Sequence, residues 1–254
     1  MSTLTPSYAR DWLDRWDRQQ EGYLPEREDR FTAIADAVEA GAGRPDPLVI
    51  DLGCGPGSLS TRLLDRLPKA TVVAVDADPL LLALGKAAHG HRDGLRFVRA
   101  NLSDADWVGR LKLDRPADAA VSTTALHWLS GEDLRVMYRD LATVLDTGGL
   151  LINGDHFFVD ETPTLKTIEA GLVQSAKDRA FGGNPPEAWG DWWEAVAADS
   201  ALSGLYLERD IASHHGSPSG LLSVHVDALR DAGFGEVGTI WQLGSDRILC
   251  GVRS

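Results

Sequence analysis

The sequence predicts an α/β protein built on a doubly wound, mostly parallel sheet. Three observations support this: apolar runs alternate with helical segments from residue 48 onward, a glycine-rich turn follows the first run, and a turn at 244–246 joins the last two runs. Alternating strands and helices are typical of βαβ units, whose strands are parallel. The final turn has the composition of a hairpin, so it departs from a purely parallel sheet.

The core elements follow from local patterns. Strand candidates contain mostly β-branched and apolar residues, and helix candidates repeat apolar residues three and four positions apart. Strands are expected at 48–51, 71–76, 95–101, 119–123, 150–155, 236–243 and 247–252. Helices are expected at 58–67, 79–89, 104–113 and 130–145. Pro68 ends the first of these helices, Pro79 begins the second, and Gly148 with Gly149 ends the last.

Two segments lie outside this repeating pattern. Residues 1–44 hold an aromatic helix and a second helix around Phe31, and residues 160–218 hold one helix around Ile168 and another that is rich in tryptophan. A chain of 254 residues fits one domain with a modest insertion. We therefore expect a single domain, 1–254, whose core is formed by 45–159 and 219–254.

Composition limits the partners. The formal net charge of -13 disfavours nucleic acid, because that binding depends on neutralising phosphates. Cys54 and Cys250 are too few for a disulfide framework, and no apolar run approaches the roughly 18 residues of a membrane span. His214 and His215 are adjacent and lack a third ligand, so no metal is expected. We expect a cytoplasmic protein without a membrane partner; the sequence does not predict its oligomeric state.

The strongest motif is the glycine turn after the first strand. Gly53, Gly55 and Gly57 follow Asp51 at alternate positions, which suits a backbone that takes positive φ angles or passes close to a ligand. An ordinary strand-to-helix turn and a dinucleotide site are the alternatives. The dinucleotide pattern places its third glycine at position 58, where Ser58 stands. Asp51 would oppose a pyrophosphate and suits a cationic amino group.

This D-x-G-x-G-x-G segment resembles the first motif of class I S-adenosylmethionine-dependent methyltransferases, and the resemblance extends over 45–158 and 225–253. It implies a seven-stranded Rossmann-like sheet with an antiparallel last strand and S-adenosyl-L-methionine as cofactor. The loop, including Cys54, would pass under the methionine portion. Asp51 would lie near the ammonium group, directly or through water.

The resemblance assigns further residues to the cofactor. Asp76, at the end of the second strand, can accept hydrogen bonds from both ribose hydroxyls, although it could instead cap the next helix. Asn101 stands where relatives carry an acidic residue that meets adenine; an amide oxygen can accept the same bond, but Asn101 could merely begin a turn. The remaining candidates are Ala77, Leu102 and Thr123 in this site, and Arg27 and Arg30 toward the cofactor carboxylate.

Two histidines are candidate general bases. His127 follows the fourth strand and His156 follows the fifth, and ligands of doubly wound sheets bind beyond these carboxyl ends. Histidine titrates near neutrality, so either can accept a proton. The alternatives are that His127 only packs under the cofactor and that local backbone satisfies His156.

Aromatic residues are candidates for substrate contact. The two helical segments, 1–44 and 160–218, could form a lid that excludes water and supplies an apolar wall, as such segments commonly do in the family. The candidate residues are Trp12, Tyr23, Trp128 and Trp193. Plain packing is the alternative for tryptophans at helical spacing.

These expectations define the function that the sequence favours. It is the transfer of a methyl group from S-adenosylmethionine to an oxygen or nitrogen of a small-molecule acceptor. The acceptor itself is left open, because an amine needs no base whereas a hydroxyl benefits from one. A tRNA or protein methyltransferase, and a cofactor-binding protein of the same fold that transfers no methyl group, are the alternatives.

Overall fold

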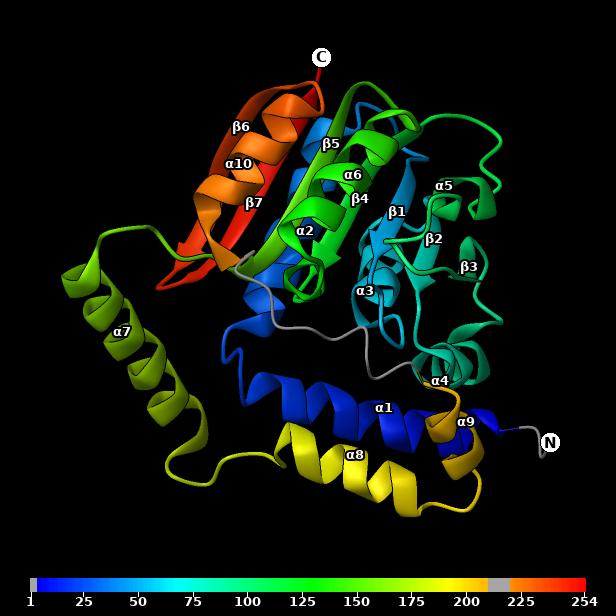
Figure 1. Cartoon of the computed structure of the whole chain (residues 1–254). Helices are drawn as coiled ribbons and strands as arrows, with labels where there is room; N and C mark the ends of the chain where they lie inside the picture. The colour runs from blue at the N-terminus through cyan, green and yellow to red at the C-terminus, as the bar shows by residue number, and fades with distance from the viewer. Residues whose placement is uncertain (1–3, 210–219) are drawn as a thin grey trace.

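The computed structural model describes residues 4–209 and 220–254, which form a seven-stranded sheet flanked by helices (Figure 1). In sheet order the strands are β3 (Leu95–Arg99), β2 (Thr71–Asp76), β1 (Leu48–Leu52), β4 (Ala117–Thr123), β5 (Leu145–His156), β7 (Asp246–Arg253) and β6 (Phe234–Leu243). The first five are parallel, β7 is antiparallel to β5, and β6 pairs antiparallel with β7. The predicted fold class and hairpin are confirmed.

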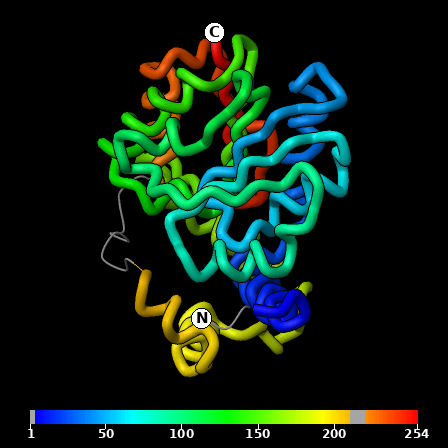
Figure 2. The backbone as a smooth tube through the Cα atoms, turned by 90° about the vertical axis from the view of Figure 1, so that its right-hand side faces the viewer, coloured from blue at the N-terminus to red at the C-terminus, as the bar shows by residue number. Residues whose placement is uncertain are grey.

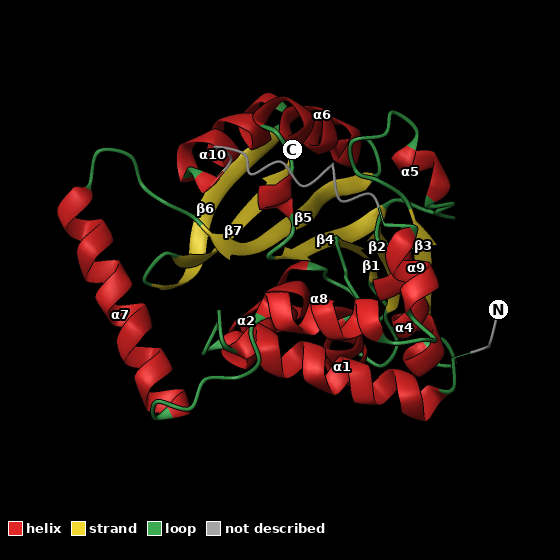
Figure 3. Ribbon diagram, turned by 60° about the horizontal axis from the view of Figure 1, so that its bottom comes forward, coloured by secondary structure: helices red, strands yellow, loops and turns green. Residues whose placement is uncertain are grey.

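Helices cover both faces of the sheet, so every residue of β1 is buried. One face carries α5 (Trp107–Arg110), α6 (Gly131–Ala142) and α10 (Leu222–Asp231), and the other carries α2 (Arg27–Gly41), α3 (Ser58–Arg66) and α4 (Pro79–His89) (Figure 3). Their apolar stripes pack on the alternating side chains of the strands, forming two core layers. The sequence analysis did not predict α10.

Local chemistry fixes where the helices near the site begin. Pro79 opens α4, and the Asp78 carboxylate accepts the backbone N–H groups of Leu80 and Leu81 at 2.9 and 3.1 Å. Ser130 caps α6 in the same way through the N–H of Asp133. Such caps satisfy N–H groups that have no partner within the helix.

Two predicted helices have wrong boundaries. The helix expected at 130–145 ends at Ala142, and β5 begins at Leu145, so Gly148 and Gly149 lie inside the strand. The register between β4 and β5 shifts here, since Ala117 pairs with Leu145 but Ala119 pairs with Leu150, and the bulge takes up the extra residues. The helix expected at 104–113 is only the short α5, because residues 101–104 form a turn.

Three helices gather beyond the carboxyl ends of the parallel strands. We call α1 (Pro6–Glu21), α8 (Trp189–Ala198) and α9 (Ser203–Leu207) the helical cover; α1 and α8 run side by side below the sheet (Figures 1 and 2). Trp12 and Trp192 join them, with ring centroids 5.6 Å apart at 88°. The same hydrophobic cluster includes leucines of α4, so the helical cover also packs on this helix of the sheet's outer face.

The long helix α7 (Pro163–Phe181) stands apart from the cover, beyond β6 (Figure 3). Ala176 is its single buried residue, and Leu165, Ile168 and Leu172 are about half exposed. The two helices predicted within 160–218 therefore occupy different places, and only the tryptophan-rich one joins the cover. No helix in the described part of the chain is both long and apolar enough to cross a membrane.

Candidate active site

A cavity of about 1090 Å³ lies between the carboxyl ends of the parallel strands and the helical cover. It is centred where β1 has β2 on one side and β4 on the other, the switch point at which doubly wound sheets bind ligands. Ligand pockets commonly measure about 300–1,000 Å³, so this one has room for a cofactor and a second small molecule. The predicted residues that line it are Tyr23, Arg27, Gly53, Cys54, Gly55, Asp76, Ala77, Asn101, Leu102, Thr123, His127, Trp128, His156 and Trp193.

Four predicted residues do not line the cavity. Asp51 precedes the glycine loop, Gly57 ends the loop at the N-cap of α3, and Trp12 is buried in the cover. Arg30, expected at the cofactor carboxylate, is fully buried and pairs with Asp246 at 2.8 Å. It lies one helical turn beyond Arg27, with its side chain against Gly154 of β5, and does not line the cavity.

No metal cluster accompanies these residues. Within residues 4–209 and 220–254, no three His, Cys, Asp or Glu side chains are grouped to hold a metal ion. His214 and His215 lie outside the described residues, so the structure does not address that part of the prediction.

The glycine loop presents bare backbone to the cavity. Gly53 has φ +67°, and a Cβ there would lie 2.3 Å from the Cβ of Ala125, so glycine is required on both grounds. Gly55 has φ +55°, and a Cβ there would meet only Trp16 at 3.8 Å and Leu81 at 4.0 Å. The space that this missing side chain leaves is available to the flexible part of a ligand.

Asp76 sits between this loop and the start of α4. Its carboxylate accepts the N–H of Gly55 at 2.7 Å on one oxygen and the N–H of Asp78 at 2.8 Å on the other. Burial raises the pKa of Asp76 to about 6, against the lowering effect of these bonds. Because each carboxylate oxygen has a second lone pair, Asp76 can still accept hydrogen bonds from a ribose diol.

Asp51 is a buried carboxylate under the loop. The hydroxyl of Ser60 donates to one oxygen at 2.5 Å, and the other oxygen has no hydrogen-bond partner among the described residues. Burial, with the negative charge of Asp76, raises the pKa of Asp51 to about 7. An unfilled acceptor of this kind suits an ammonium group reached through water. Bare loop, diol acceptor and buried carboxylate together fit S-adenosylmethionine.

His127 is held by a residue that the sequence analysis missed. Its Nδ1 lies 2.8 and 3.0 Å from the two oxygens of Asp155, a buried residue near the end of β5. Burial disfavours the imidazolium charge, but the hydrogen bond and charge of Asp155 outweigh it, so the pKa of His127 is above its ordinary 6.5. Asp155 directly precedes the predicted His156, but its contact with His127 depends on the pairing of β5 with β4.

The chain approaches His127 through a strained residue. Thr124 has φ +48°, uncommon outside glycine, and its N–H bonds the carbonyl of Gly154 at 2.9 Å. Strain of this sort concentrates at functional sites. His156, on the neighbouring strand, has a pKa lowered chiefly by burial, and its Nδ1 is 3.4 Å from the Ser245 hydroxyl.

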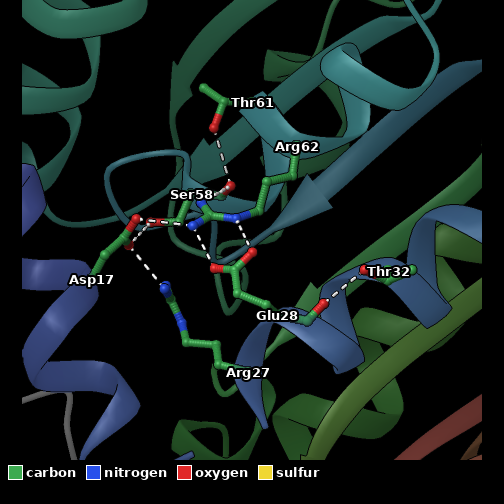
Figure 4. Close-up of polar contacts among 7 residues, drawn as sticks. All are labelled: Asp17, Arg27, Glu28, Thr32, Ser58, Thr61 and Arg62. Atoms are coloured by element: carbon green, nitrogen blue, oxygen red, sulfur yellow. Dashed lines mark hydrogen bonds and ion pairs between the residues drawn. The ribbon is translucent and has the colours of Figure 1, made fainter. Parts of the chain in front are cut away.

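An ionic cluster fastens the cover to the glycine loop (Figure 4). Asp17 of α1 accepts from Arg27 at 2.9 Å and from the hydroxyl of Ser58, the first residue of α3, at 2.6 Å. Arg62 adds bonds to Asp17 and Glu28. Although burial opposes its charge, these cations lower the pKa of Asp17. The cluster therefore fixes the position of α1 relative to the end of the glycine loop.

A second contact joins the cover to the turn that follows β2. Arg209 donates to Asp78 at 2.5 Å and lies over the ring of Trp193, its guanidinium carbon 3.4 Å from the centroid. Asp78 in turn donates its N–H to Asp76. The sequence did not predict four of the lining residues, which are Gln20, Arg99, Arg110 and Arg209; Trp16 and Trp189, which also line the cavity, belong to the two aromatic helices expected to form the lid.

Comparison with known proteins places this site in a family. Residues 49–149 match the sequence model of the methyltransferase domain. The chain is 26% identical over 169 residues to an uncharacterized methyltransferase of Geobacillus thermodenitrificans, covering 66% of this chain and 74% of the relative. These comparisons support the class that the glycine motif predicted, the class I S-adenosylmethionine-dependent methyltransferases.

Two further comparisons give context. A trans-aconitate 2-methyltransferase of Azoarcus is 30% identical over 189 residues, covering 70% of this chain and 66% of the relative. Human N-acetylserotonin methyltransferase in complex with S-adenosylmethionine has the same fold, with a TM-score of 0.56 at 13% identity over 94% of this chain. This chain spans 56% of the length of that structure.

Proposed function

We propose that this protein transfers a methyl group from S-adenosylmethionine to an oxygen or nitrogen of a small-molecule acceptor. One observation carries the proposal: a single cavity joins the glycine loop and Asp76 to the His127 and Asp155 pair. The residues proposed to bind the cofactor, which we call the cofactor seat, and the proposed proton acceptor thus line the same cavity.

The cofactor seat uses the residues described above. Gly53 and Gly55 support the methionine portion, Asp51 compensates its ammonium charge, and Asp76 accepts the ribose hydroxyls. Asn101 and Leu102 line the far end, where adenine would lie. When bound, the cofactor supplies an electrophilic methyl group on a sulfonium, so positioning and proton removal are what the protein adds.

His127 is the proposed base and Asp155 its positioning residue. With Nδ1 as donor to Asp155, the basic lone pair of neutral His127 is on Nε2. Asp155 then stabilises the imidazolium that forms when the acceptor loses its proton. His156 is the second candidate, since its lowered pKa keeps it neutral at neutral pH.

The acceptor side is bounded by the helical cover, which we propose excludes water during transfer. The trans-aconitate relatives methylate a small molecule by name, which supports this acceptor class. A tRNA acceptor is the weaker alternative, because the net charge of -13 opposes a polyanion. Cofactor binding without methyl transfer is the other alternative.

The first test is cofactor binding. Asp76→Ala removes the acceptor shared by Gly55, Asp78 and the ribose, so we expect S-adenosylhomocysteine to bind about ten- to hundredfold more weakly, roughly 1.5–3 kcal/mol. Isothermal titration measures it. Asp104→Ala, at the exposed rim of the same cavity, is the matched control and should bind as the wild type. Unchanged affinity in Asp76→Ala, or no binding to the wild type, contradicts the proposal.

The second test is the base. For a hydroxyl acceptor, His127→Gln should lower kcat by about 10²–10⁴ and leave S-adenosylhomocysteine affinity unchanged. The base works when neutral, so wild-type kcat/KM should rise with pH through an ionisation above 6.5. Asp155→Asn should move that ionisation to lower pH and reduce the plateau. An identical pH profile in Asp155→Asn would remove His127 from the mechanism.

A further inference from the structure

Four aromatic side chains form one continuous lining of the cavity. Trp16 lies 6.1 Å from Trp193 between ring centroids, Trp189 lies 5.8 Å from Trp193, and the Tyr23 hydroxyl accepts the backbone N–H of Trp189 at 3.2 Å. We call these residues the aromatic wall. Trp189 and Tyr23 are 39% and 45% exposed, far more than core packing leaves to aromatic residues. Plain packing therefore does not account for the outer half of the wall.

The wall lies across from the methionine end of the cofactor seat. Trp16 is the nearest side chain to the open position above Gly55, at 3.8 Å. The same cavity includes His127. A molecule resting on the wall would thus share one cavity with the glycine loop and the proposed base, as an acceptor must.

Most arginines of the cavity are already paired with carboxylates of the protein. Three arginines of the cavity already have a carboxylate partner: Arg27 with Asp17 at 2.9 Å, Arg110 with Asp106 at 3.2 Å and Arg209 with Asp78 at 2.5 Å. Arg99 has no ion pair among the described residues, but it pairs in register with Asp76 on the adenosine side. An acceptor with several carboxylates would find no unpaired arginine beside the aromatic wall.

We propose that the acceptor is a planar aromatic molecule whose reacting group is a hydroxyl, a phenol in chemical class, stacked on the aromatic wall. This rests on the proposed function and deepens it. Aromatic faces favour offset or edge contacts with flat rings, and they offer little to a polycarboxylate. The structure thereby distinguishes this site from that of an enzyme for a tricarboxylic acid, despite the trans-aconitate relatives.

The reaction balances without another reactant. The acceptor oxygen forms the new bond to the methyl carbon while its proton passes to Nε2 of His127. The carbon–sulfur bond breaks with its electron pair left on sulfur, giving neutral S-adenosylhomocysteine. The imidazolium then returns its proton to water.

The test uses the full chain with S-adenosylmethionine and three acceptors: 2-naphthol, decahydro-2-naphthol, which has the same carbon skeleton but is not planar, and trans-aconitate. S-adenosylhomocysteine formation is measured, together with 2-naphthol binding to the homocysteine complex by tryptophan quenching. We expect 2-naphthol to bind and react, with kcat/KM at least tenfold above either of the others. Greater turnover of trans-aconitate or of the saturated alcohol overturns the inference, as does failure of 2-naphthol to bind.

A matched pair of variants tests the wall itself. Trp189→Ala should raise KM for 2-naphthol about tenfold and leave S-adenosylhomocysteine affinity within twofold. Phe158→Ala removes a similarly exposed aromatic residue, 38% against 39%, that does not line the cavity, and should change neither. Equal effects in the two variants overturn the inference. Loss of cofactor binding in the wild type would instead overturn the proposed function, so the two failures are distinguishable.

Discussion

The two halves of the cavity are built in different ways. On the sheet half, Asp51 and Asp76 each stand at or beside the end of a strand, so local sequence brings them to one edge. On the cover half, Trp12 meets Trp192, and Arg15 meets Glu187 across 172 positions of the chain. The first half follows from strand order, whereas the second depends on tertiary contacts between helices. The two halves should therefore differ in how they unfold.

The largest expected effect is on the cover. Trp192 is fully buried between α1 and α8, so Trp192→Ala should cost about 3–5 kcal/mol of docking free energy. Because the sheet has its own two core layers, amide hydrogen exchange should speed up in α1 and α8 while β1 and β4 stay protected.

The control is a tryptophan of equal burial in the sheet layer. Trp107 is also fully buried, and Trp107→Ala should lower the global free energy of unfolding in urea by a similar amount. If Trp192→Ala exposes all segments equally, the cover and sheet unfold as one unit and the comparison fails.

The next effect belongs to the sheet half and depends on pH. The folded-state pKa of Asp51 is raised from 3.8 to about 7, so folding favours its protonated form. Stability should therefore fall as the pH rises from about 4 to about 7. Asp51→Asn cannot ionise and should lose less stability over this range, by on the order of 1–3 kcal/mol. Urea unfolding at pH 5 and 7.5 measures this; parallel behaviour of the two proteins would contradict it.

The same contrast explains what the sequence could predict. The sequence predicted that Gly53 and Gly55 of the glycine loop, Asp76 and His127 would meet, because each lies at or shortly after the end of a strand and parallel strands align their carboxyl ends; all of them line the cavity. The residues that hold these side chains in place were not predicted. Asp155 joins His127 only because β4 pairs with β5, which a single strand's pattern does not show.

The positions of the arginine side chains were harder to predict from the sequence. Arg27 and Arg30 look equivalent in the sequence, but Arg30 is drawn to Asp246 across 216 positions of the chain and leaves the cavity. Arg209 follows no recognisable motif, and its partner Asp78 also caps α4. Long-range ion pairs depend on how the helices dock, and hydrophobic periodicity carries no signal for them.

The smallest expected effects compare two arginines that hold the cover by the same chemistry. Arg209 pairs with Asp78 and lies over Trp193; Arg15 pairs with Glu187 at 2.5 Å and lies 4.4 Å from the ring of Trp12. They differ in burial, since the Arg209 side chain is 6% exposed and that of Arg15 is 42% exposed.

Replacing each of these two arginines should affect the release of the bound ligand differently. Asp78 donates its N–H to Asp76, so Arg209→Ala loosens the cover directly above the ribose seat. We expect S-adenosylhomocysteine to dissociate about tenfold faster, roughly 1.4 kcal/mol, by stopped-flow tryptophan fluorescence. Arg15→Ala breaks an exposed pair of at most about 1 kcal/mol and should leave that rate within twofold. If both variants release the ligand equally fast, the cover acts as one body, and the link from Arg209 through Asp78 to Asp76 carries no special role.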